Sequence, residues 1–337
     1  MLPTQKDSRE KINLVQLMST MKAITIFIFI TLIMNQAPAA QDLQAVDETV
    51  KSYSHSFKKP EKLAELINRD FTKPEEKARA IYAWIALNVE YDVKALKRKT
   101  KSVSYSYSTP EEKAEIENRI ENDLAVKTLR TRKGVCQGYS TLFKVLCDLT
   151  DIECKIITGT AKTMPLDIGR KTMQTNHAWN AVEINKTWHL VDVTWGAGHL
   201  DTRDGQFVKI YTDVYFFMKP EKFFLKHYPE NPEWLLIEKN ASDFAGLPLY
   251  YTDYFTANID IIEPQDGIVK IRKDKTISII LRNSENRKIT FGFNNTKKAN
   301  LTEPEIKNGL YHYELKVSGS FLTIYADNNA LVTFKLD

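Results

Sequence analysis

Two runs of alternating residues, separated by Asn185-Lys186, constrain the fold of this 337-residue chain more than any other feature. The first run covers 177–184 and the second covers 187–195. Two such runs joined by two residues predict an antiparallel hairpin. If the turn is Asn185-Lys186, Ile184 pairs with Thr187 and the register of the whole hairpin follows.

This register brings one imidazole and one carboxylate together. It places Trp179 opposite Asp192 and His177 opposite Thr194. Because side chains alternate between the two faces of a strand, His177 and Asp192 share a face as diagonal neighbours, which longer side chains can bridge. His189 lies on the opposite face under the same pairing. A hydrogen-bonded strand histidine and a carboxylate that bonds backbone are the structural alternatives for this pair.

A cysteine follows a break in the chain at Gly134. Cys136 precedes a helical pattern whose apolar face carries Tyr139, Leu142, Phe143, Leu146 and Leu149. At a helix N-terminus, free N–H groups and the helix dipole favour a thiolate and can stabilise an oxyanion. A thiol becomes a good nucleophile when an imidazole takes its proton and a carboxylate orients that imidazole. Cys136, His177 and Asp192 are therefore the candidate catalytic residues, and a buried inert thiol is the alternative for Cys136.

Other residues near these three have less specific patterns. Gln137 either hydrogen-bonds an oxyanion or caps the helix. Trp179 and Trp195 are candidates for the walls of a substrate cleft, or for core, rather than for chemistry. His227 is expected to have a structural role.

Residues 41–130 predict a mainly helical region. Helix starts are expected at 72–76 and 109–112, where a threonine is followed by an early proline and by acids in the first turn. Residues 94–109 are rich in lysine, serine, threonine and tyrosine, which predicts an exposed loop.

The pattern changes near residue 256, after a predicted linker at 238–255. Short alternating runs separated by turn residues predict a small all-β domain, of the sandwich type, over 256–337. The expected strands are 268–271, 276–281, 288–293, 309–317, 321–325 and 331–336. No cluster of catalytic residue types occurs among them.

The N-terminus predicts export through a signal peptide in region 1–40. Met21-Lys22 leads into an apolar stretch at 23–34, and Ala37-Pro38-Ala39 gives a small-x-small cleavage pattern. The apolar stretch is too short to favour a stable membrane span, although an uncleaved anchor is the alternative. The mature protein is thus expected outside the cytoplasm, secreted, periplasmic or at the cell surface. Met1 and Met21 are both candidate starts.

Charge and cysteine content exclude several classes of protein. The net charge of +4 gives no reason to expect a nucleic-acid partner. Three cysteines leave at least one unpaired. Cys147 and Cys154 either bridge or remain a helix thiol and a strand thiol, the second being favoured because a chain of this size needs no disulfide. No Cys-x-x-Cys or His-x-x-x-His pattern indicates a metal site, and no cofactor is expected.

The three catalytic segments also resemble a known family. Gly134 to Ser140, Asn176 to Asn180 and Trp188 to Trp195 are similar to the three motifs of the transglutaminase-like superfamily. The helix at 80–85 with Tyr91-Asp92 is similar to the helix that precedes these motifs in the superfamily. The segment 217–236 resembles the closing segment of the kyphoscoliosis-peptidase-like branch. The resemblance covers about 60–240.

The resemblance implies an α+β, papain-like domain at 41–245, with the nucleophile on a helix N-terminus and the other two residues on an antiparallel sheet. It implies Cys136, His177 and Asp192 as the triad. The insertion at 94–125 departs from the compact pattern of the family, so the substrate cleft is expected to be remodelled there.

Three functions are open at this point. The first is an exported cysteine hydrolase that cleaves a protein or peptide through a thioester acyl-enzyme. The second is transfer of the acyl group from a protein glutamine to an amine. The third is a non-catalytic binding module that reaches a cell-surface partner through the C-terminal β domain.

Overall fold

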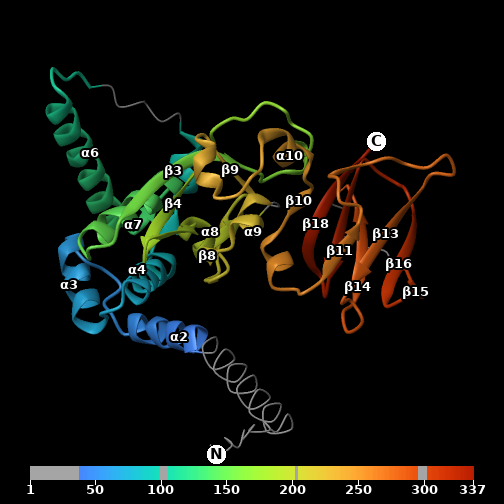
Figure 1. The fold of residues 1–337 in the computed structure, drawn as a ribbon, viewed down its shortest axis with the longest axis horizontal. Coiled ribbons are helices and arrows are strands. Elements are labelled where there is room, and N and C mark those ends of the chain that lie inside the picture. Colours follow the sequence, from blue (N-terminus) through green and yellow to red (C-terminus); the bar gives the residue numbers. More distant parts are fainter. Residues whose placement is uncertain (1–37, 99–104, 202–203, 295–301) are drawn as a thin grey trace, which may run out of the picture. The chain divides into compact units, whose positions relative to one another are not determined.

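The computed structural model describes residues 38–98, 105–201, 204–294 and 302–337 (Figure 1). Helix α2 (Pro38–Lys51) belongs to one compact unit, residues 1–52, and the rest of the chain forms another. The expected signal segment at 23–34 lies outside the described residues. Among the helices that are described, none combines the length and the apolarity needed to cross a bilayer.

The second unit begins with a helical region, as the sequence predicts. Its helices are α3 (Pro60–Asp70), α4 (Pro74–Asn88), α5 (Val93–Lys97), α6 (Pro110–Thr131) and α7 (Cys136–Asp148). The predicted start of α6 is confirmed, because the Thr109 side chain accepts the backbone N–H of Glu112 at 3.2 Å. The start of α4 differs in detail, since Lys73 rather than Thr72 is the N-cap and no side chain caps it.

Helices α4 and α7 form the buried centre of this region. On α4, the side chains of Ile81, Trp84 and Ile85 are fully buried. Helix α7 contacts α4 and α6 and also the sheet strand β4 (His177–Ile184). The predicted apolar face of α7 is buried along Leu142 to Leu146, whereas Leu149 at its end is exposed. Packing against several elements fixes the position of the α7 N-terminus.

A five-stranded antiparallel sheet contacts these helices. Its strand order is β8 (Phe216–Met218), β5 (Thr187–Val191), β4, β3 (Cys154–Ala161) and β9 (His227–Pro229). The predicted hairpin register is confirmed, because Ile184 pairs with Thr187 in an antiparallel ladder. Asn185 and Lys186 both have positive φ, 53° and 65°, as the two central residues of a type I′ turn require.

The second hairpin strand is shorter than the sequence predicts. Pairing stops at Asn180 and Val191, and Asp192 is already the N-cap of helix α8 (Val193–Ala197). The expected pairing of His177 with Thr194 therefore does not form. The physical reason is that the Asp192 carboxylate accepts the Trp195 backbone N–H at 3.0 Å, which starts a helix where the alternating pattern alone predicts a strand.

The chain returns to the sheet through short elements. These are β6 (Gly198–Leu200), β7 (Phe207–Lys209), β8, α9 (Pro220–Phe224), β9 and the 3₁₀ turn η2 (Pro232–Leu235); another turn, η1 (Pro165–Asp167), follows β3. The backbone N–H of Asp192 bonds the Tyr215 carbonyl at 3.0 Å, which ties this return to the end of β5.

The C-terminal region is all-β and contains two antiparallel-rich sheets. One has the order β11 (Asp260–Glu263), β13 (Thr276–Arg282), β16 (Leu310–Lys316), β15 (Glu305–Lys307). The other has β10 (Leu249–Tyr250), β18 (Asn329–Leu336), β17 (Phe321–Ala326), β14 (Ile289–Phe293), with β12 (Ile268–Val269) also on β18. A core that includes the fully buried Phe291 and Phe334 joins residues of both sheets. The α+β class with a β-rich C-terminal region is thus confirmed.

The segment expected to be a linker, 238–255, is structured. It contains α10 (Ala241–Gly246), β10 and the 3₁₀ turn η3 (Thr252–Phe255), and β10 joins the C-terminal sheet through β18. The buried Lys162 ammonium donates to the carbonyls of Phe244 at 2.8 Å and Leu247 at 2.7 Å. This cation satisfies the end of α10, whose last carbonyls have no partner within the helix.

Candidate active site

Cys136 is the first residue of α7 and is half-buried. The extended Val135 is the N-cap of this helix, and no side chain caps it. The backbone N–H of Gly138 bonds the Val135 carbonyl at 2.8 Å. The flanking glycine has a packing reason: a Cβ on Gly138 would lie 2.8 Å from Thr128 Oγ1 of α6. The close approach of the two helices holds Cys136 at a helix end whose dipole favours a thiolate.

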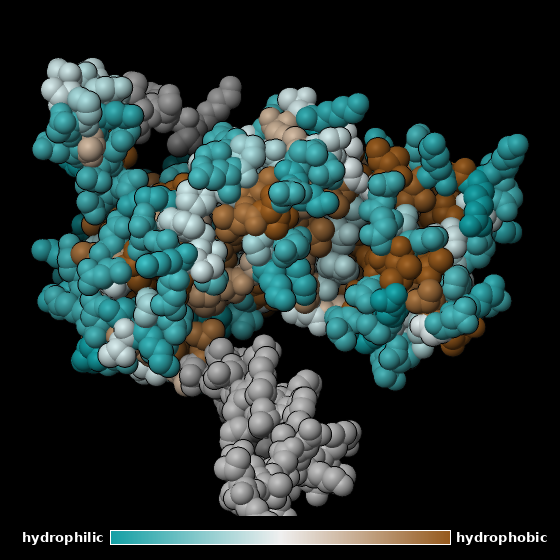
Figure 2. Space-filling model, viewed as in Figure 1, coloured by the Kyte–Doolittle hydropathy of each residue, from teal (hydrophilic) through white to brown (hydrophobic). Residues whose placement is uncertain are grey.

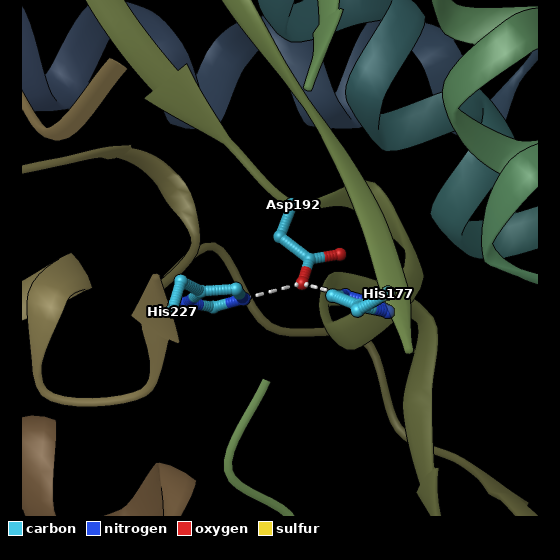
Figure 3. A group of neighbouring side chains, drawn as sticks. All are labelled: His177, Asp192 and His227. Atoms are coloured by element: carbon cyan, nitrogen blue, oxygen red, sulfur yellow. Dashed lines mark hydrogen bonds and ion pairs between the residues drawn. The ribbon is translucent and has the colours of Figure 1, made fainter. Parts of the chain in front are cut away.

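His177 and Asp192 are brought together as the sequence predicts. His177 opens β4, Asp192 follows β5 directly, and His177 Nε2 lies 2.7 Å from Asp192 Oδ2 (Figure 3). Both residues are buried, with Asp192 fully enclosed. Since Nε2 is held by the carboxylate, Nδ1 is the ring nitrogen left for Cys136, whose thiol is close enough to the imidazole for the two groups to shift each other's pKa.

The electrostatics of these three groups favour a thiolate beside an imidazolium. Burial alone raises the pKa of the Cys136 thiol, but His177 and the backbone N–H of Ala178 together outweigh burial, so the pKa lies below its ordinary value. Burial lowers the pKa of His177, yet Asp192 and Cys136 together raise it to about 10. Burial likewise opposes the charge on Asp192, and His177 and His227 hold the pKa of that carboxyl well below its usual range.

His227 also belongs to this cluster, although the sequence alone indicates only a structural role for it. Its Nε2 lies 3.0 Å from the same Asp192 oxygen that bonds His177, so one carboxylate oxygen lies between two imidazoles (Figure 3). Burial lowers the pKa of His227 to about 4, which leaves it neutral at neutral pH. The only sequence signal for His227 was the resemblance of segment 217–236 to a family closing segment.

Tyr91 is a second residue that sequence reasoning did not assign to the site. It lies in the short strand β1 (Glu90–Tyr91), which pairs with β2 (Lys133–Gly134) immediately before the nucleophile. Burial raises the pKa of Tyr91 well above its ordinary value, and the neighbouring Cys136 thiolate raises it further, while a hydrogen bond from the Cys136 backbone opposes the rise. The phenol therefore sits against the N-terminus of α7.

The remaining predicted residues occupy different positions. Gln137 is exposed and its amide bonds Thr141 Oγ1 at 3.3 Å, on its own helix. Trp179 is 1% exposed, so it belongs to the core. Trp195 is half-buried and its ring stacks on His177, with ring centres 5.0 Å apart. His189 stacks on Phe217 and makes no described contact with the triad residues.

The donor atoms of His177, Asp192 and His227 all lie within 4.8 Å of one another, which is a separation that could accommodate a metal ion. Both Nε2 atoms, however, are at hydrogen-bond distance from one carboxylate oxygen, 2.7 Å and 3.0 Å. These contacts account for the cluster through hydrogen bonds alone. What the arrangement can do chemically is activate the thiol of Cys136.

Residues 61–193, which include the three candidate catalytic residues, match the family model of the transglutaminase-like superfamily. The chain carries a transglutaminase-like domain. This domain combines α3 to α7 with the sheet strands β3, β4 and β5, so the family assignment and the observed elements agree.

The transglutaminase-like domain is similar in sequence to curated kyphoscoliosis peptidases. Over 208 residues the chain is 28% identical to the kyphoscoliosis peptidase of Mus musculus and, equally, to that of Homo sapiens. Each alignment covers 60% of this chain, and the chain spans 29% of the length of either relative. A solved structure described as a TGase is 17% identical, with a TM-score of 0.28, and covers 58% of this chain and 43% of that one.

Proposed function

We propose that this protein is an exported cysteine hydrolase that cleaves peptide or amide bonds. The observation that carries the proposal is the bonding of His177, which contacts the Cys136 thiol on one side and the Asp192 carboxylate, at 2.7 Å, on the other. The imidazole thereby interacts with both the nucleophile and the orienting carboxylate, as nucleophilic catalysis by a cysteine requires. The two mammalian relatives are named as peptidases, and cleavage of a peptide bond by this chain would agree with that name.

The proposed reaction has two steps. The Cys136 thiolate attacks the carbonyl carbon, and His177 as imidazolium donates its Nδ1 proton to the departing amine, which leaves a thioester. Water then attacks the thioester, His177 takes one water proton, and the carboxylic acid is released with the thiolate–imidazolium pair restored. The N-terminus of α7, through its dipole and its backbone N–H groups, would stabilise the oxyanion. The Gln137 amide, the other candidate for this role, bonds Thr141 Oγ1 on its own helix at 3.3 Å.

Transfer of the acyl group to an amine would use the same thioester, so the product decides between hydrolysis and transamidation. We expect mature wild-type protein to release free acid from a peptide library and Cys136→Ala to release none. Incorporation of a labelled primary amine into protein glutamines in place of acid release would establish transfer. An unchanged rate in Cys136→Ala would refute both.

Export and domain roles belong to the same proposal. The apolar stretch at 23–34 supports removal of a signal peptide within residues 1–40. Sequencing of the N-terminus of protein secreted by its host tests this, and a retained Met1 or Met21 would contradict it.

The proposed catalytic domain spans 41–245, and the β domain at 256–337 is proposed to reach a cell-surface partner. Hydrophobic residues are visible on the β region in Figure 2, and Ile306 there is 62% exposed. Loss of cell association on Ile306→Glu, with activity retained, is the expected result, and unchanged association would count against this role.

A further inference from the structure

Lys226 is a buried cation beside the candidate active site. It lies between α9 and β9 and only 9% of it is exposed. Its Nζ sits 4.2 Å from the centre of the Trp195 ring. Burial of a lysine is unfavourable unless the ammonium is paired or hydrogen-bonded, so the position needs a physical reason.

Within the described residues, the Lys226 ammonium has the aromatic ring but no hydrogen-bonding or ion-pairing partner. Burial lowers its pKa to about 8, opposed only by the charges of Asp192 and Asp253 at a distance, with no hydrogen bond contributing. Among the described residues, the polar side-chain atoms that are buried from solvent and make no hydrogen bond are Trp179 Nε1, Asn180 Oδ1 and Ser284 Oγ. Nζ of Lys226 is not one of them, so it reaches solvent.

Lys162 shows how this fold satisfies a buried lysine that has a purely structural role. Lys162 is 1% exposed, and its Nζ donates to the carbonyls of Phe244, Ala245 and Leu247 at 2.8, 3.4 and 2.7 Å. Lys226 has none of these bonds. Its ammonium thus retains three donors for a group that the chain itself does not supply.

The position of Lys226 connects it to the chemistry. The Trp195 ring that lies under the ammonium also stacks on the His177 imidazole, with ring centres 5.0 Å apart and planes inclined by 23°. Trp195 is half-buried, whereas His177 and His227 beside it are buried. The ammonium and the catalytic imidazole therefore share one aromatic wall.

We propose that Lys226 and Trp195 form a subsite for a carboxylate of the substrate, next to the scissile bond. The inference rests on the hydrolase function proposed above and names its substrate class: peptides with a negative charge close to the cleaved amide. A carboxylate would accept charge-assisted hydrogen bonds from Nζ, and the Trp195 ring would pack against the adjoining carbons. The carboxylate is either a peptide C-terminus or an Asp or Glu side chain.

Two alkylating reagents test this subsite without a known substrate. Iodoacetate carries a carboxylate and iodoacetamide is its neutral counterpart, and both alkylate a thiolate. The measured quantity is the rate at which iodoacetate alkylates Cys136 divided by the rate at which iodoacetamide does so. Mass spectrometry monitors both reactions. We expect Lys226→Met, which keeps the apolar stem, to lower this ratio about tenfold, and Lys226→Arg to restore most of it.

Lys222→Met is the matched control, since Lys222 is an exposed lysine on α9 and both of its rates should equal those of wild type. An equal ratio in wild type and Lys226→Met, with thermal unfolding unchanged, overturns the subsite. The hydrolase proposal fails separately: if His177→Ala does not slow iodoacetamide, the thiolate is not activated, whatever the ratio. If Lys226→Met does not fold, Lys226→Arg still tests the subsite. A fall of the rate ratio in this folded variant, which keeps the positive charge, would contradict a subsite based on charge.

Protection experiments then identify the source of the carboxylate. Peptides with a free or an amidated C-terminus, and with Glu or Gln inside the chain, compete with iodoacetamide for Cys136. Stronger protection by the free C-terminus assigns the subsite to a peptide end, and stronger protection by Glu assigns it to a side chain. In either case Lys226→Met should abolish the preference, and equal protection by charged and neutral peptides would overturn the proposal.

Discussion

Replacing Asp192 with asparagine isolates the charge that holds His177 as an imidazolium. The pair is buried, its atoms lie 2.7 Å apart, and an asparagine at this position would keep both the shape and the oxygen that accepts the Trp195 N–H. Removing one partner of a buried ion pair costs about 3–5 kcal/mol. At about 1.4 kcal/mol per pKa unit, this corresponds to a fall of roughly 2–4 units in the pKa of His177.

The consequence should be visible in the reactivity of Cys136. The pKa of His177 would fall from about 10 toward neutrality, the imidazolium would be lost near pH 7, and the thiol pKa would rise toward about 8.5. The assay is the rate of iodoacetamide alkylation of Cys136 between about pH 5 and pH 10. We expect Asp192→Asn to move the midpoint of this profile upward and to slow alkylation at pH 6 at least tenfold.

Asp148→Asn, the same change at the exposed end of α7, is the control and should leave the profile unaltered. Thermal unfolding confirms that each variant is folded. A profile for folded Asp192→Asn that coincides with that of wild type would refute the reasoning, because the carboxylate would then have no influence on the imidazole that contacts Cys136.

Three other predictions concern stability. Gly196→Ala should lower the free energy of unfolding by about 1–3 kcal/mol, because its Cβ would collide with the Tyr82 hydroxyl. Gly246→Ala is the control and should change this free energy little, because open space surrounds Gly246; urea titration measures both variants. Phe291→Ala should cost about 3–5 kcal/mol, and exposed Ile306→Ala less than about 0.5, by the same titration. The pKa of His177 is raised on folding, so its contribution is complete below the unfolded value of about 6.5 and is lost as pH rises through about 10. The melting temperature of wild type should therefore fall over this interval more steeply than that of His177→Gln, and parallel curves would contradict the assignment.

The hairpin shows which features of this fold are accessible from sequence. A two-residue turn leaves one register in which Ile184 meets Thr187, and this local rule placed His177 beside Asp192 correctly. The same rule predicts a β5 that is too long, because the alternating pattern contains no information that the Asp192 side chain caps a helix. The six predicted C-terminal strands are present for a similar reason, since turn residues mark their ends. The short strands β10, β11 and β15 were missed because they carry too few alternating residues to be recognised.

Local sequence rules of this kind do not predict contacts between segments that are distant in the chain. His227 is 35 residues from Asp192 along the chain and lies in a segment without periodicity, yet it bonds the same carboxylate oxygen. The approach of Lys226 to Trp195 depends on the same return of the chain to the sheet. No local sequence pattern specifies these contacts, because they depend on the pairing of β9 with the distant strand β3.

The pairing of β10 with β18 has a practical meaning for anyone who divides this chain. A C-terminal fragment that begins at residue 256 would lack Leu249 and Tyr250, and the backbone groups of β18 that they engage would be left as an open edge. Exposed edges of this kind recruit strands from other molecules. Such a fragment would tend to self-associate, while one that begins before α10 would carry its own edge protection.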